Sequence, residues 1–202
     1  MPRRKFLVYG GAGALALGGA LFAGWWQVDG PGAPGLTRQR PLPLSSMSFA
    51  LIDHEGNKVG PGMLIGQATM VFFGFSNCPD ICPTTLSDIS KWLDALGDDS
   101  DKINVVFITV DPDRDNAEAM AEYVRYFHPA IRGWTGSRKE TEKVADEFGI
   151  TFEKMNFDNG GYSMNHTASV FLFDKKGRFT GVIDYHESKE FAVPKIQRAM
   201  RD

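Results

Sequence analysis

Cysteine is scarce in this chain: 202 residues contain only two, Cys78 and Cys82. An excess of either charge is also lacking, because 22 basic residues face 25 acidic residues and the formal net charge is −3. We therefore expect no nucleic-acid partner, since proteins that bind nucleic acids carry a basic surplus. Internal repeats and low-complexity tracts are absent. The folded part is expected to be one domain of about 155 residues, which can bury a core without disulfide staples.

Charge is missing altogether from Phe6 to Trp26, directly after a basic cap at Arg3–Lys5. A helix of this length is about 31 Å long, which matches a bilayer core. The basic flank should stay in the cytoplasm and direct the rest of the chain outward. The cap also resembles a twin-arginine export signal. We predict that residues 1–26 form an export signal or membrane anchor.

The end of this segment favours an anchor that is not cleaved. A good small-x-small cleavage site is absent, and Trp25 and Trp26 resemble an interfacial aromatic anchor. We predict a single-pass protein of the inner (cytoplasmic) membrane, with its domain on the periplasmic or external side. Residues 27–47 are rich in proline and glycine and are expected to be an extended linker. Residues 48–202 are the predicted folded domain.

Apolar runs alternate with helical patterns along this domain. Met70–Phe73 and Val105–Val110 are nearly continuous apolar strands, typical of parallel sheets covered by helices on both faces. Asp115 and Ser137, each followed three residues later by glutamate, are expected to cap two helices. The order predicts an α/β domain with a thioredoxin-like fold, in which a central mixed sheet is flanked by helices. The expected elements are a hairpin at 49–59, strands at 69–75, 105–110, 169–173 and 179–183, and helices at 83–96, after 115, after 137 and around 196–200.

Both cysteines lie in the turn between the strand at 69–75 and the helix that follows it. Because proline suits the first helical position, Pro83 predicts that Cys82 sits at the helix cap and Cys78 in the connection before it. Helix N-termini lower the pKa of thiols and create reactive or ligating sulfur. Such a pair can close a disulfide, exchange disulfides or hold a soft metal.

Two sulfurs alone rarely complete a metal site, and His166 is the candidate third ligand. It lies in a predicted loop just before the strand at 169–173, and the fold can bring this loop to the cysteines. Two thiolates and an imidazole suit copper, because sulfur favours Cu(I) and imidazole accommodates Cu(II). Zinc would accept the same donors, usually with a fourth ligand. His54 is expected to be a solvated turn residue, and His128 a partner of a helix C-terminus.

Four segments resemble the Sco/SenC family of copper-binding proteins. They are Gly74–Leu86 around the cysteines, Val110–Asp115, Trp134–Ser137 and Tyr162–Thr167. The resemblance extends from about residue 46 to 200, and the membrane anchor also matches the family.

The resemblance implies a metallochaperone in which Cys78, Cys82 and His166 bind one copper ion, as Cu(I) or Cu(II). It also implies help in assembling the binuclear copper centre of cytochrome c oxidase subunit II. A copper donor protein and a thiol reductant are the further partners, because exported cysteines tend to oxidise.

One residue departs from the family pattern: members commonly carry aspartate where this chain has Asn165. The change removes a negative charge beside His166 that could tune the ligand or partner docking. Asp111, Asp113 and Arg114 are expected to shape a loop as solvated capping residues, without direct chemistry.

The main alternative is a membrane-tethered thiol–disulfide oxidoreductase. It would use Cys78 and Cys82 as a redox pair to reduce the cysteines of a copper-site precursor. The chain lacks a Cys-x-x-Cys motif, and no proline lies between Pro129 and Pro194 to face the cysteines as in thioredoxins. A peroxidase and a redox sensor or copper store are further alternatives. We expect a binding and transfer cycle in which no substrate is turned over.

Overall fold

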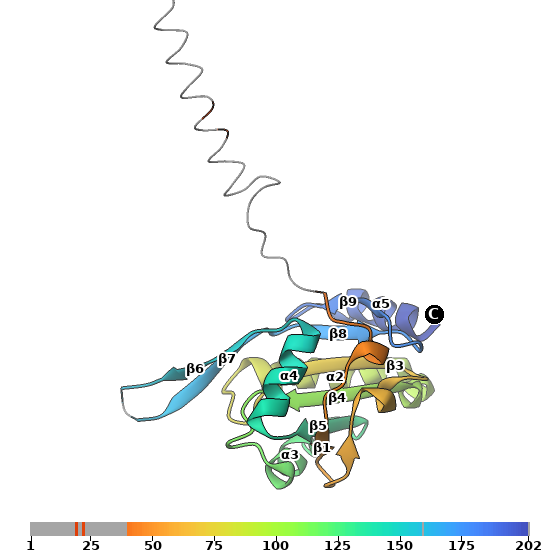
Figure 1. Ribbon diagram of the computed structural model, residues 1–202. Helices are drawn as coiled ribbons and strands as arrows, with labels where there is room; N and C mark the ends of the chain where they lie inside the picture. The colour runs from red at the N-terminus through yellow and green to blue at the C-terminus, as the bar shows by residue number, and fades with distance from the viewer. Residues whose placement is uncertain (1–18, 20–21, 23–39, 159, 202) are drawn as a thin grey trace, which may run out of the picture. The chain divides into compact units, whose positions relative to one another are not determined.

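A computed structural model describes residues 19, 22, 40–158 and 160–201 of the chain. Its centre is a seven-stranded sheet of order β2-β1-β5-β4-β3-β8-β9 (Figure 1). The three middle strands are parallel, and the two strands on either side of them run antiparallel to their neighbours. The strands are β1 (Leu51–Asp53), β2 (Lys58–Val59), β3 (Ala68–Gly74), β4 (Ile103–Thr109), β5 (Ile131–Thr135), β8 (Val170–Phe173) and β9 (Phe179–Ile183). The predicted central mixed sheet is confirmed.

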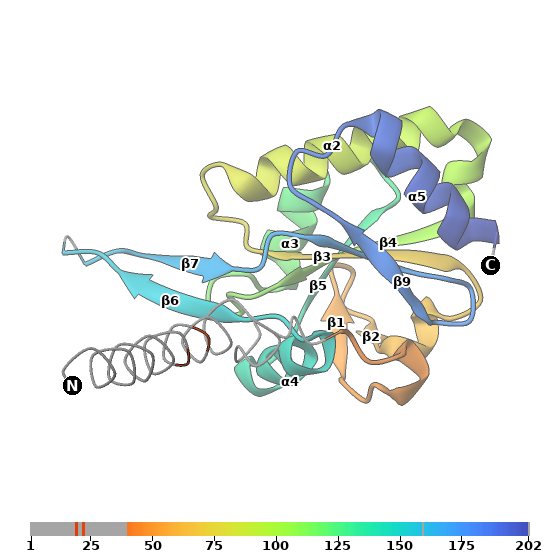
Figure 2. The same cartoon turned by 90° about the horizontal axis from the view of Figure 1, so that it is seen from above.

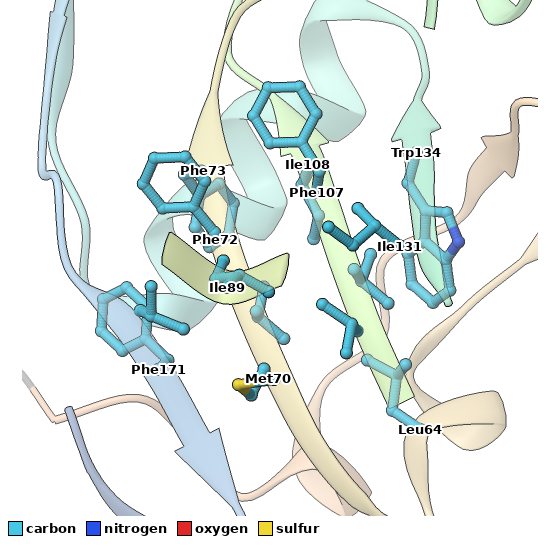
Figure 3. Packing of buried hydrophobic residues seen from close by; sticks show 14 of the residues in the cluster. Leu64, Met70, Phe72, Phe73, Ile89, Phe107, Ile108, Ile131, Trp134 and Phe171 are labelled. Atoms are coloured by element: carbon cyan, nitrogen blue, oxygen red, sulfur yellow. The ribbon is translucent and has the colours of Figure 1, made fainter. Parts of the chain in front are cut away.

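Burial on both faces explains why β3 and β4 consist mainly of apolar residues. Every residue of β3 is buried, and so is every residue of β4 except the half-buried Asn104. Phe72 and Phe107 are register partners on these strands, and their rings stack with centroids 5.8 Å apart. Figure 3 shows these side chains among the buried residues of the core. The β3–β4 pair is therefore the rigid centre of the domain.

Helices cover both faces of the sheet (Figure 2). On one face, the Phe107 ring contacts Tyr123 of α3, with centroids 5.7 Å apart. On the other face, Phe73 packs edge-on against Phe148 of α4, with centroids 5.0 Å apart. The helices are α2 (Ile81–Leu96), α3 (Ala117–Val124), α4 (Arg138–Phe148) and α5 (Lys189–Arg201), with short 3-10 turns η1 (Leu44–Ser46), η2 (Pro61–Leu64) and η3 (Gly97–Lys102). The predicted flanking of the sheet by helices is also confirmed.

A second, two-stranded sheet projects from the body of the domain (Figures 1 and 2). It is the hairpin of β6 (Phe152–Asn156) and β7 (Tyr162–His166), in which Phe152 pairs with His166. All residues of β6 are exposed or half-buried. The sequence predicted a loop here, and that prediction is wrong: His166 is the last residue of a strand.

Two predicted helix starts are also wrong. Helix α2 begins at Ile81 with Asp80 as its N-cap, so Cys82 lies inside the first turn and not at the cap. Pro83 still lies in the first turn. Backbone N–H groups have no acceptor within the helix there, so the missing N–H of proline removes no helical hydrogen bond. In α3 the N-cap is Asn116, whose side chain accepts a hydrogen bond from the N–H of Ala119. The predicted cap of α4 is correct, because Ser137 accepts from the N–H of Glu140.

The N-terminal predictions fall mostly outside the described residues. Of the predicted anchor, residues 1–26, only Gly19 and Phe22 are described. Within the described part of the chain, no helix has the length and apolar character needed to cross a bilayer. Leu44 and Met47, which the predicted linker 27–47 includes, are buried in the core of the domain.

Candidate metal centre

The two cysteines lie where the rigid centre of the sheet meets α2. Cys82 is fully buried in the first turn of the helix, and Cys78 is half-buried in the loop before it. Both are free thiols. The backbone N–H of Cys82 donates to Sγ of Cys78 across 3.4 Å. The strand-to-helix turn therefore presents two sulfurs side by side, one accessible and one enclosed.

Gly74, the last residue of β3, makes room for the buried sulfur. A Cβ atom at this position would lie 2.7 Å from Sγ of Cys82 and 2.7 Å from the ring of Phe107. Carbon and sulfur atoms do not approach this closely without displacement, because optimal contacts are about 3.5–4.0 Å. The glycine is thus required by the close packing of Cys82 on the strand end.

His166 brings its imidazole to the same sulfur from the hairpin. Its Nε2 lies 3.5 Å from Sγ of Cys82, and its Nδ1 lies 3.0 Å from the carbonyl oxygen of Thr167. Because a carbonyl can only accept, Nδ1 carries the proton and donates, which leaves the lone pair of Nε2 facing the thiol. Metal-ligating histidines commonly have this arrangement. The predicted convergence of His166 on the cysteine turn is confirmed.

Aromatic side chains enclose the imidazole. The ring of His166 is 5.9 Å from Phe75 and 6.3 Å from Phe72, both in edge-on contact. His166 also lines an open groove of about 420 Å³, together with Thr151–Glu153, Asn165 and Thr167. Asn165 is exposed and lines this groove, so it lies at the accessible rim of the site.

The two thiols have strongly different pKa values because they share a hydrogen bond. The thiol of Cys82 donates to Cys78. This bond, together with the backbone N–H groups of Asp80 and Cys82, outweighs burial and lowers the pKa of Cys78 to about 3. The same bond, together with burial, raises the pKa of Cys82 well above its ordinary range. At neutral pH the pair therefore carries one thiolate, at Cys78, and one proton, at Cys82. A metal bound by both sulfurs must displace that proton.

Asp115 holds the loop that carries Cys78 in place and is not the helix cap that the sequence predicts. It is fully buried, and its carboxylate accepts from the N–H and hydroxyl of Ser76 at 3.0 and 2.5 Å. The hydroxyl of Thr109 donates to the same carboxylate at 2.6 Å. These bonds tie the end of β4 to the loop that carries Cys78. Nothing in the local sequence distinguishes this role from capping, because the partners are distant along the chain.

Two other expectations about polar residues require correction. Asp111 is not solvated: it is 1% exposed and pairs with Arg114. His54 is half-buried and accepts a hydrogen bond from the N–H of Gly133 at 3.1 Å. His128 accepts from the N–H of Ala130 at 3.1 Å, so both histidines have structural partners away from the cysteines.

The spacing of Cys82 and His166 fits a shared ion. A sulfur at about 2.3 Å and a nitrogen at about 2.0 Å from one metal lie about 3.5 Å apart at a tetrahedral angle. The observed separation of Sγ and Nε2 is 3.5 Å. Across residues 40–158 and 160–201, however, no group of three or more His, Cys, Asp or Glu side chains is already arranged as a metal site. Cys78, Cys82 and His166 are therefore candidate ligands that would have to close around the ion.

Known proteins with similar sequences and folds show to which family the chain belongs. The profile of the SCO1/SenC family matches residues 38–201. An SCO2-like protein of Rickettsia prowazekii is 38% identical over 133 residues, covering 65% of each chain. The human protein called Protein SCO1 homolog, mitochondrial, is 31% identical over 194 residues, covering 93% of this chain and 64% of the human one. The chain thus spans slightly less than two thirds of the length of these relatives.

A solved structure supports the same assignment. Bradyrhizobium japonicum ScoI, determined with copper bound, superimposes with a TM-score of 0.71 at 38% identity, over 75% of this chain and 96% of that one. The profile match, the similar sequences and the common fold show that this chain belongs to the SCO1/SenC family.

Proposed function

We propose that this domain binds one copper ion through Cys78, Cys82 and His166 and passes it to the binuclear copper centre of cytochrome c oxidase subunit II. Proteins of the family take part in copper delivery and in cytochrome c oxidase assembly. The observation that carries the proposal is the 3.5 Å contact between Nε2 of His166 and Sγ of Cys82. It places an unprotonated imidazole nitrogen at ligand spacing from one of two adjacent soft sulfurs.

The protonation of the cysteines sets the conditions for loading. The Cys78 thiolate is ready to bind, whereas Cys82 must release its proton when copper arrives. An oxidised pair would offer no thiolates, so a thiol reductant must act before a copper donor protein loads the site. Both are proposed partners. Copper itself is the cargo, and the groove beside His166 gives partners access to it.

The setting of this cycle is proposed from the N-terminal sequence. Residues 1–26 would anchor the chain by a single span in the inner membrane, and the domain would lie on the periplasmic or external side. This side is oxidising, which is why reduction of the cysteines is a required step.

A thiol–disulfide oxidoreductase is the second candidate, and one observation favours it. Cys78 is half-exposed with a lowered pKa, and the buried Cys82 lies beside it. A thiolate with this exposure can attack a partner disulfide, and the neighbouring thiol can resolve the mixed disulfide. The partner would be reduced and the pair would become a disulfide.

Copper titration of the reduced full-length chain in detergent distinguishes the two candidates. We expect the parent to bind about one copper ion, and His166→Ala to weaken Cu(II) binding at least about 100-fold, since it removes one of three ligands. Cys78 and Cys82 should still form a disulfide in this variant. His186→Asn is the matched control, because His186 is exposed and contacts Asp88 and the ring of Tyr185, away from the cysteines. If His166→Ala binds both copper states like the parent, copper transfer is refuted and the oxidoreductase is favoured.

A further inference from the structure

The hairpin that carries His166 has no strand partner in the main sheet among the described residues. Its strands β6 and β7 pair only with each other. At its base, the N–H of Thr167 donates to the carbonyl of Thr151, and the N–H of Thr151 donates to the hydroxyl of Thr167. These bonds close the hairpin on itself. Isolated two-stranded hairpins are marginally stable, so other contacts must hold this one against the domain.

Arg114, in the loop between β4 and α3, makes such contacts. Its guanidinium lies over the ring of Tyr162, the first residue of β7, at 3.8 Å from the ring centroid. Its Nη1 donates to the carbonyl oxygen of Tyr162 at 3.2 Å. One side chain of the domain body thus contacts both the backbone and the side chain of the strand that ends at His166.

Asp111 fixes Arg114 and Tyr162 to each other. Its carboxylate accepts from Nε of Arg114 and, at 3.0 Å, from the hydroxyl of Tyr162. Because Asp111 is 1% exposed, these bonds are shielded from water. The guanidinium also lies 5.8 Å from the ring of Phe75, which packs against the imidazole of His166. Arg114 therefore lies between the cysteine loop and the hairpin.

We propose that Arg114 is a positioning residue that holds β7 against the domain and thereby keeps the His166 imidazole at ligand spacing from Cys82. This role of Arg114 extends the proposed copper function. The expected effect of Arg114 on metal binding rests on that function. The anchoring of the hairpin does not depend on metal. A lysine could replace the charge of Arg114 but not its planar fork, which both stacks on Tyr162 and donates to two acceptors.

The test compares Arg114→Gln with Arg138→Gln in the full-length chain in detergent. Arg138 is the matched control because it pairs with Asp113 of the same loop but, in the described part of the chain, has no bond to the hairpin. Without metal, Arg114→Gln should increase hydrogen exchange of the β7 amides about 10-fold or more, while exchange in β3 and β4 stays as in the parent.

The second measurement is a Cu(II) titration followed by electron paramagnetic resonance. Removal of a group that orients a metal-binding histidine typically lowers metal affinity about 10–100-fold. We expect Arg114→Gln to lower Cu(II) affinity by this factor and to weaken the coupling of the copper signal to the imidazole nitrogen. Arg114→Lys should rescue neither measurement, whereas Arg138→Gln should match the parent in both.

Three results would overturn the proposal. The first is that hydrogen exchange of the β7 amides is unchanged in Arg114→Gln. The second is that this exchange is faster in Arg114→Gln but its Cu(II) affinity and nitrogen coupling are those of the parent. The third is that Arg114→Lys restores both measurements fully. If Arg114→Gln does not fold, Tyr162→Phe replaces it, because this change removes only the hydroxyl that donates to Asp111 and should also increase β7 exchange. A parent that binds no copper would refute the proposed function, while the metal-free exchange result would still decide whether Arg114 anchors the hairpin.

Discussion

Substituting Gly74 by alanine tests whether the buried sulfur of Cys82 is held by close packing on β3. The added Cβ would lie 2.7 Å from Sγ of Cys82 and 2.7 Å from Cε2 of Phe107. Against an optimal separation of about 3.5–4.0 Å, each contact is about 1 Å too short. Either the sulfur or the ring must therefore move.

Neither neighbour can move without disturbing other packing. Phe107 is fully buried, and it stacks on Phe72 and contacts Tyr123. Cys82 belongs to the first turn of α2 and is also fully buried. Insertion of a methyl group into such a core typically lowers the free energy of unfolding by about 1–3 kcal/mol. We expect a loss in this range for Gly74→Ala.

Urea unfolding of the reduced, metal-free chain measures this loss. Gly62→Ala is the control, because its Cβ would have no neighbour within 4 Å and its backbone needs no positive φ. It should change the free energy of unfolding by less than about 0.5 kcal/mol. Displacement of the sulfur should also weaken copper binding in Gly74→Ala. A variant as stable as the parent, with unchanged copper affinity, would show that the sulfur is not constrained by the strand.

Two further predictions follow from the pKa shifts. Cys78 is already ionised at neutral pH and Cys82 is protonated, so binding of one copper ion by both sulfurs should release one proton. Copper affinity should therefore fall as pH decreases. Proton release on copper binding can be measured in weakly buffered solution, and release of no proton would contradict the prediction. Burial alone would raise the pKa of Asp174, but hydrogen bonds from Arg178 and Lys176 outweigh it and lower the pKa. Its contribution to stability is therefore present above the unfolded-state pKa of about 3.9 and is lost as pH falls through the folded-state value. Urea unfolding should thus show a larger loss for Asp174→Asn at pH 7 than at about pH 3, and equal losses would contradict the shift.

The parts of the fold that are apolar and local were predictable from the sequence. The β3 and β4 strands are continuous apolar runs because both of their faces are covered, and the cap of α4 is a local Ser137–Glu140 pattern. The capping pattern at Asp115 was misleading for a physical reason. Asn116 caps the helix one residue later, which leaves Asp115 free to bind Ser76 and Thr109. Such long-range hydrogen bonds leave no periodic signal in the sequence.

The β6–β7 hairpin was not predictable by the same rules. Its first strand buries no residue, so the alternation of apolar and polar residues that marks a half-buried strand is missing. What holds the hairpin is contact with distant parts of the chain: Tyr162 lies against Arg114, and Met164 is buried in the core of the domain. The sequence did indicate His166 as a candidate ligand, because it precedes the predicted strand at 169–173 and the predicted fold can bring that segment to the cysteines. It could not indicate that a strand would present the imidazole.

The candidate centre is therefore built from two parts that differ in burial. The sulfurs lie in the connection between the fully buried strand β3 and the first turn of α2, where Gly74 and Asp115 fix the turn that carries them. The imidazole lies at the end of an outlying hairpin that is anchored by Arg114 on Tyr162 and by the burial of Met164. Since thiolates suit Cu(I) and imidazole helps to accommodate Cu(II), movement of the hairpin alone would weaken the binding of Cu(II) more than that of Cu(I).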